Sequence, residues 1–195
     1  MQNLNLSVPK KIVLIGASTG GPGQIQKIIT SLPVLTDTTL VIAQHMAKGF
    51  IPSFVKRLNE HSLNSIEIAS DTQILESSHV YLCCGDTSIK QDGQSLRFTH
   101  KHAQENTFNP DINMIFNSFV PYAKNTNILS IILTGIGDDG VDGCKNLSIN
   151  GATCLTENEK SAVVDGMTSR ARENVPNVIV LDIDQIVSRI KEFCS

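Results

Sequence analysis

The sequence lacks the features that would place it in a membrane, on nucleic acid or outside the cell. No apolar stretch approaches the roughly 18 residues of a transmembrane helix, so we expect no membrane insertion. Residues 1–9 are largely polar and are not built like a signal peptide, so we expect a cytoplasmic protein. With 16 basic and 19 acidic residues, the net charge of -3 leaves no basic surface for nucleic acid.

The cysteine spacing of a metal site is missing as well. The five cysteines are odd in number, and no two of them have the CxxC spacing of a zinc site or redox motif. We therefore expect no metal and no disulfide framework, and we interpret the cysteines as buried free thiols. They are Cys83, Cys84, Cys144, Cys154 and Cys194.

The order of apolar runs and helical segments predicts the fold class. Of the 195 residues, 41% are apolar and 18% are charged, which suits a single domain over 1–195 with its core at about 10–193. Strand-like runs alternate with helical ones, which predicts an α/β fold with a doubly wound, mostly parallel sheet. The expected strands are 12–16, 39–44, 65–69, 80–84, 128–134, 152–156 and 178–181, and the expected helices are 24–31, 50–60, 112–123, 140–150, 162–174 and 183–193.

One region departs from this alternation. Residues 85–109 show no helical period, and the Asp92-Gly93 pair is a hairpin turn signal. We expect a small antiparallel hairpin excursion with arms at 88–90 and 95–100, followed by a polar loop over 99–109.

The most informative segment is residues 16–23, with the sequence GASTGGPG. It joins an apolar run to a helical pattern and contains the G-x-S-x-G motif of a nucleophile elbow, in which Ser18 sits on a sharp turn at the end of a strand. The segment lacks the lysine of a P-loop and the second glycine of a dinucleotide-binding turn. A serine nucleophile is the favoured interpretation, and an anion-binding loop and a structural turn are the alternatives.

A histidine follows the next expected strand. His45 comes directly after 39–44, at the strand end where ligands collect in an open α/β sheet. The remaining histidines fall in segments that resemble polar loops, and His100 with His102 gives too few ligands for a metal site. By elimination His45 is the candidate base. The other histidines are His61, His79, His100 and His102.

Two aspartates follow the expected strand 128–134, in the sequence TGIGDDG. We expect one of Asp138 and Asp139 to cap the following helix, and the glycines around them suit a carboxylate that orients an imidazole in a neighbouring loop. An acidic metal site formed with Asp142 is the alternative. A Ser–His–Asp set performs nucleophilic catalysis, but its chain order here differs from the Ser, Asp, His order of α/β-hydrolases. The sequence therefore predicts a serine hydrolase on a different α/β scaffold.

Three separated motifs make the sequence recognisable: GASTGG at 16–21, QHM at 44–46 followed by Gly49-Phe50, and LTGIGDDG at 133–140. Over roughly residues 10–190 the chain resembles the chemotaxis protein-glutamate methylesterases (CheB). The resemblance implies hydrolysis of methyl esters on receptor glutamates, deamidation of certain receptor glutamines, and no cofactor. It also implies the cytoplasmic domains of methyl-accepting chemotaxis receptors as partners, and we expect a monomer.

Carried over by motif, the resemblance makes Ser18 the nucleophile, His45 the base and Asp139 the orienting carboxylate. The family's oxyanion donor, usually a methionine, falls on Ile136, whose backbone N–H does not depend on the side chain. We expect the backbone N–H of Thr19 to be a second donor. The usual enzyme carries an N-terminal receiver domain, which we do not expect here. The alternative function is a non-catalytic module that binds a receptor or an anion on the same scaffold.

Overall fold

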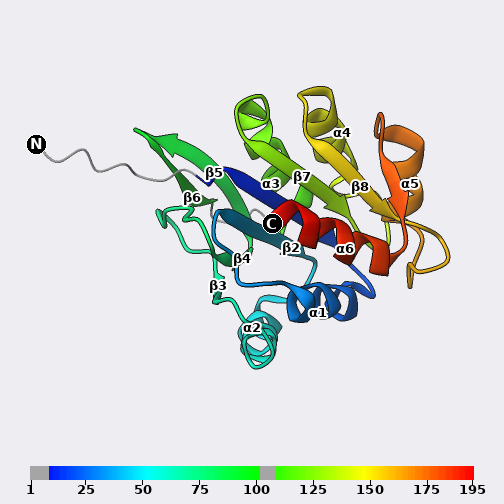
Figure 1. Ribbon diagram of the computed structural model, residues 1–195, viewed down its shortest axis with the longest axis horizontal. Helices are drawn as coiled ribbons and strands as arrows, with labels where there is room; N and C mark the ends of the chain where they lie inside the picture. Colours follow the sequence, from blue (N-terminus) through cyan, green and yellow to red (C-terminus); the bar gives the residue numbers. More distant parts are fainter. Residues whose placement is uncertain (1–8, 102–108) are drawn as a thin grey trace, which may run out of the picture.

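The computed structural model describes residues 9–101 and 109–195, and its centre is a seven-stranded parallel sheet (Figure 1). The strand order in these residues is β3-β4-β2-β1-β7-β8-β9, and all neighbouring strands run parallel. This is the doubly wound α/β fold that the sequence predicts. The strands are β1 (Lys11–Ala17), β2 (Thr38–Gln44), β3 (Ile66–Ile68), β4 (Val80–Leu82), β7 (Asn127–Ile132), β8 (Thr153–Glu157) and β9 (Ile179–Leu181).

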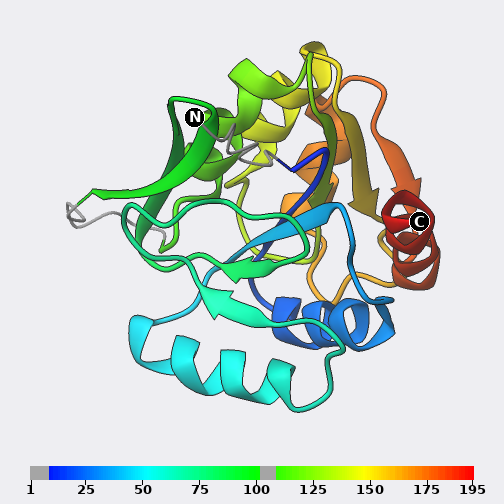
Figure 2. The ribbon, with the colours of Figure 1, turned by 60° about the vertical axis from the view of Figure 1, so that its left-hand side comes forward.

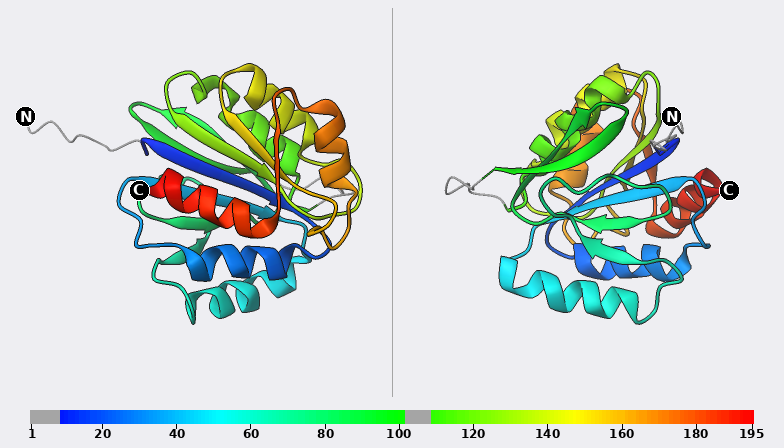
Figure 3. Two further views of the ribbon diagram at one scale, coloured as in Figure 1. Left: turned by 45° about the vertical axis from the view of Figure 1, so that its right-hand side comes forward. Right: turned by 90° about the vertical axis from the view of Figure 1, so that its left-hand side faces the viewer.

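Helices cover both faces of the sheet, which explains why its central strands are apolar throughout (Figure 3). Ile12 and Leu14 of β1 belong to the core on the side of α3, α4 and α5, whereas Val13 and Ile15 belong to the core on the side of α1, α2 and α6. No helix among the described residues has both the length and the apolar composition to cross a bilayer. The helices are α1 (Gly21–Ser31), α2 (Ile51–Asn59), α3 (Ile112–Phe119), α4 (Val141–Ile149), α5 (Met167–Asn174) and α6 (Ile183–Cys194), with short 3-10 turns η1 (Lys48–Phe50) and η2 (Val120–Tyr122).

The predicted hairpin is present as β5 (Asp86–Asp92) and β6 (Ser95–Lys101), and it lies beside α3 (Figure 2). The first arm is longer than the predicted 88–90, and the second agrees with the predicted 95–100 to within one residue, so His100 lies in β6 and not in the predicted loop that overlapped it. The backbone N–H of Ile89 donates to the Ser118 hydroxyl of α3 at 3.0 Å, which fixes the hairpin on that helix. His102 and most of the predicted polar loop lie outside the described residues.

The structure corrects the expected start of the helix after β8. The prediction placed this start at residue 162, but α5 begins at Met167. Residues 158–166 form a loop (the 158–166 loop) that pairs with the loop following β7. Gly135 donates its N–H to the Val164 carbonyl at 3.0 Å, and the N–H of Gly166 donates to the Gly135 carbonyl at 3.1 Å. These hydrogen bonds between two loops compete with helix formation, which a single-segment pattern does not reveal.

The cysteines are all free, and four of them are buried as expected. Cys84 is only half-buried, which corrects the prediction for that residue. Burial raises the pKa of the Cys83 and Cys194 thiols, so both favour the unreactive thiol form.

An ion pair fastens the 158–166 loop to α5. The Arg172 guanidinium donates from Nη1 and Nη2 to the two carboxylate oxygens of Asp165, at 2.9 and 2.6 Å. Its Nη1 also donates to the Glu157 carbonyl at the end of β8, at 3.2 Å. The guanidinium holds the pKa of Asp165 below its usual range. A bidentate pair of this kind restrains the loop more than an exposed single contact does.

We predict that Arg172→Met lowers the free energy of unfolding at pH 7 by about 1–2 kcal/mol, which is toward the low end for hydrogen bonds to charged groups because both side chains are partly exposed. Because Arg172 lowers the pKa of Asp165, this stability is present above the ordinary aspartate pKa and is lost as the pH falls through the lowered value. Urea unfolding at pH 7 and pH 3 measures the difference. Arg170→Met, which removes an exposed pair with Glu173, is the control and should change little. An equal loss for Arg172→Met at both pH values would contradict the assignment.

Candidate active site

The predicted site residues meet at the carboxyl edge of the three central strands. Strand β1 lies between β2 and β7, so the loops that follow these strands are neighbours. The connections after β1 and β7 leave toward opposite faces of the sheet, which is the kind of position where α/β sheets bind ligands. Ser18, His45 and Asp139 each follow one of these three strands.

Ser18 lies on a tight turn between β1 and α1. Its backbone N–H donates to the Thr134 carbonyl at 3.0 Å, and its carbonyl accepts the N–H of Gly21, the first residue of α1, at 2.9 Å. The turn is therefore fixed from both sides. The Ser18 hydroxyl lies 3.2 Å from Nδ1 of His45.

His45 is positioned by the backbone and by a carboxylate. Its N–H donates to the Ala17 carbonyl at 2.9 Å, which ties the end of β2 to the end of β1. The ring nitrogen Nε2 lies 2.7 Å from Oδ2 of Asp139. A carboxylate at this distance requires a proton on Nε2, so the neutral imidazole presents the lone pair of Nδ1 to the Ser18 hydroxyl.

Asp139 is held at the N-terminus of α3. Its side chain is 4% exposed, and its carboxylate accepts the backbone N–H of Ile112 at 2.8 Å and that of Asn113 at 2.9 Å. Two N–H donors and the partial positive charge of a helix N-terminus stabilise the buried carboxylate. The sequence offered no direct signal for this contact, because α3 is distant from Asp139 along the chain.

The structure separates the roles of the two adjacent aspartates. Asp139 faces the imidazole, as the resemblance implied, and Asp138 is exposed. The expectation that one of them caps α4 is wrong: the N-cap is Gly140, and no side chain makes the capping bond. Within 9–101 and 109–195, no three or more His, Cys, Asp or Glu side chains form a group that could hold a metal ion, so the three aspartates of the alternative metal site do not converge.

Further acidic groups surround the histidine. Asp111 caps α3 by accepting the N–H of Met114 at 2.7 Å. Burial raises the pKa of Asp111, and the nearby carboxylates of Asp139 and Asp86 raise it further. Asp111 therefore adds a further acidic group close to the imidazole of His45.

Asn109 is a site residue that sequence reasoning missed. Its carbonyl accepts the N–H of Met46 at 3.1 Å, and its side-chain oxygen accepts the N–H of Gly85 at 3.0 Å. One residue therefore fastens the loops after β2 and β4 next to the start of α3. The Asn109-Pro110-Asp111 sequence is a turn and cap signal, and it could have located this junction.

The loop after β7 and the elbow provide two further backbone donors. In the part of the chain that the structure describes, the N–H groups of Thr19 and Ile136 make no hydrogen bond. The Thr134 hydroxyl donates to the Thr19 carbonyl at 2.9 Å and so links the two loops. The Ile136 side chain is 63% exposed.

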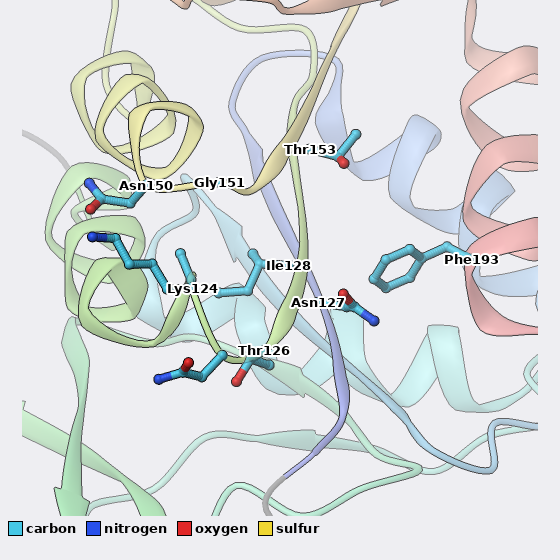
Figure 4. A pocket seen from close by; sticks show the side chains of 10 residues that line it. Lys124, Thr126, Asn127, Ile128, Asn150, Gly151, Thr153 and Phe193 are labelled. Carbon is cyan, nitrogen blue, oxygen red and sulfur yellow. The ribbon is translucent and has the colours of Figure 1, made fainter.

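A separate cavity of about 490 Å³ lies at the opposite edge of the sheet (Figure 4). It is lined by residues at the beginnings of β7 and β8, such as Asn127 and Thr153, with Phe193 of α6 on one side. Its lining contains no nucleophile paired with a base. The contacts among Ser18, His45 and Asp139 therefore lie at the carboxyl edge and not in this cavity.

Known proteins are similar to this chain in both sequence and fold. The family model described as CheB methylesterase matches residues 13–190. A protein-glutamate methylesterase/protein-glutamine glutaminase of Saccharophagus degradans is 37% identical over 92% of this chain and 49% of its own length. A relative of the same description from Carboxydothermus hydrogenoformans is 34% identical over 94% of this chain and 53% of its own length. The chain thus spans about half the length of the curated relatives it matches.

The fold agrees with a solved structure from the same group. The crystal structure of the Thermotoga maritima CheB methylesterase catalytic domain superimposes with a TM-score of 0.87, is 29% identical, and covers 95% of this chain and 99% of its own. The family model, the relatives and the fold agree with the resemblance carried by the three loop motifs, and on these grounds the chain belongs to the CheB methylesterase family.

Proposed function

We propose that this protein hydrolyses the methyl esters of glutamate side chains in chemotaxis receptors and deamidates receptor glutamines at the same site. The observation that carries the proposal is the chain of contacts from the Ser18 hydroxyl through His45 to Asp139, at 3.2 and 2.7 Å. The relatives' names, protein-glutamate methylesterase/protein-glutamine glutaminase, support the substrate class.

In the first step His45 Nδ1 takes the hydroxyl proton of Ser18 while Oγ attacks the carbonyl carbon of the ester. Asp139 keeps the proton on Nε2 and stabilises the imidazolium that forms. In chymotrypsin-type triads the serine faces Nε2, so the two ring nitrogens exchange places here. The imidazolium then returns a proton from Nδ1 to the leaving methoxide, methanol departs, and a glutamyl ester of Ser18 remains.

In the second step His45 Nδ1 removes a proton from water, whose oxygen attacks the acyl carbon. The bond from this carbon to Ser18 Oγ then breaks, the imidazolium returns the proton to Oγ, and the glutamate side chain leaves as a carboxylic acid that ionises. A glutamine side chain follows the same path, with ammonia as the leaving group. Both reactions form the same acyl-enzyme, so a single site accounts for the two activities, methylesterase and glutaminase, in the relatives' names.

The oxyanion of each tetrahedral intermediate needs donors that are ready before the reaction. We assign this role to the backbone N–H groups of Thr19 and Ile136, which make no hydrogen bond within the described residues. Isoleucine in place of the family's usual methionine leaves a backbone donor unchanged.

The surroundings of the serine suit a protein substrate. Phe50, Ile136 and Val163 are 69%, 63% and 66% exposed, and they belong to three different segments near the carboxyl edge. Exposed apolar side chains around a reactive group are typical of a protein docking surface. We propose that this rim contacts the cytoplasmic domains of methyl-accepting receptors, so that the enzyme acts in the cytoplasm.

We predict that Ser18→Ala lowers the rate of methanol release from methylated receptor by roughly four to six orders of magnitude, because only binding and oxyanion stabilisation remain. A fluorophosphonate should label the wild-type protein at Ser18 and should leave the variant unlabelled. Circular dichroism checks that both proteins are folded. Methanol release that survives in folded Ser18→Ala protein would refute the proposal and favour the non-catalytic binding module.

We also predict that Asp139→Asn lowers turnover by about 10⁴-fold. Both oxygens of Asp139 accept backbone N–H groups of α3, and Oδ2 also faces His45. Asparagine has no negative charge to stabilise the imidazolium, and at either oxygen position its NH₂ faces a backbone N–H of α3, so His45 loses both its charged partner and its alignment. Asp138→Asn is the matched control, because Asp138 is exposed, and it should retain nearly full activity. The reverse ranking of the two variants would show that the wrong aspartate has been assigned.

A further inference from the structure

Gln44 is a buried polar residue whose side chain contacts the backbones of Ser18 and His45. It is the last residue of β2 and is 2% exposed, although it is a glutamine in a strand that is otherwise filled by apolar and small side chains. Buried carboxamides are kept in such positions when their hydrogen bonds are needed. The mechanism above gives Gln44 no role.

The Gln44 side chain joins the backbones of the nucleophile and the base. Its Nε2 donates to the Ser18 carbonyl and to the His45 carbonyl, each at 2.9 Å. One planar NH₂ group therefore fixes the distance between these two carbonyls. The His45 N–H also donates to the Ala17 carbonyl at 2.9 Å, which is a second link between the ends of β1 and β2.

The other end of the carboxamide is held without any hydrogen bond. Within the described residues the Oε1 atom of Gln44 is buried and has no partner. It packs against Gly21, where a Cβ would collide with it, so glycine leaves room for this atom at the start of α1. An unsatisfied buried oxygen destabilises a protein, and an apolar side chain of similar length would avoid that cost. The two donor contacts are therefore the reason to have glutamine here.

We infer that Gln44 is a positioning residue that keeps the Ser18 hydroxyl and His45 Nδ1 at reactive separation. This inference rests on the proposed function of Ser18 and His45. Gln44 acts through their backbones and does not touch the substrate. Displacements of about 1 Å between reacting groups can lower a rate by about 100-fold.

The test replaces Gln44 with methionine, which has a similar length but no donor. We expect Gln44→Met to lower both kcat for methanol release and the rate of Ser18 labelling by a fluorophosphonate by about 10- to 100-fold. KM should change little, and thermal stability should stay near that of the wild type because the unpartnered oxygen is removed together with the two hydrogen bonds. Gln73→Met is the control: Gln73 also uses its carboxamide in hydrogen bonds, to Glu67 and Ser70, but in a loop that makes none of the contacts described for the site.

Gln44→Glu provides a second variant of the same shape. Its carboxylate places an oxygen against the carbonyls of Ser18 and His45, so we expect a loss at least as large as for methionine. Wild-type labelling at Ser18 tests the proposed function on its own, since its absence would refute the role of Ser18 whatever the variants do. With the wild type labelled, unchanged labelling in Gln44→Met would overturn the positioning role. Failure of both Gln44 variants to fold, or a loss of stability without a loss of kcat, would show a structural role and overturn it as well.

Discussion

The buried carboxylate of Asp139 is the point through which the parts of the site are connected. It follows β7, it accepts a hydrogen bond from the imidazole that follows β2, and it accepts two backbone N–H groups from the first turn of α3. Burying a carboxylate is costly unless donors replace the lost water, and these three donors do so. The orientation of His45 therefore depends on the docking of a whole helix. The β5–β6 hairpin is bound to this same helix through the Ile89 N–H and the Ser118 hydroxyl.

The sheet and the three loop motifs could be predicted from sequence because their signals are local. Each of the seven expected strands has a counterpart, since apolar runs bounded by turns describe buried parallel strands well. The errors arose where segments distant in the chain interact. Residues 162–166 pair with the loop after β7 and so do not join α5. Glycine, and not an aspartate, caps α4, because Asp139 is already bound to α3.

In the candidate site too, features with local sequence signals were predictable and contacts between distant segments were not. The serine elbow, the histidine and a neighbouring aspartate follow from their strand-end positions, and the choice of Asp139 came from the resemblance to a family. The supporting contacts were not predictable, because they depend on tertiary proximity. Asn109 joins the loops after β2 and β4, and the carboxamide of Gln44 spans Ser18 and His45.

The backbone and the side chain of residue 136 have separate roles in the proposed mechanism. In the proposed mechanism its N–H serves the chemistry, while its side chain, 63% exposed, belongs to the rim that we propose contacts the receptor. Chemistry and recognition can then change independently at one position. A substitution here, such as isoleucine for methionine, changes the shape of the proposed rim without moving the donor that the proposed mechanism requires. A lineage that acquires a new receptor can adapt through such side chains while its reaction stays the same.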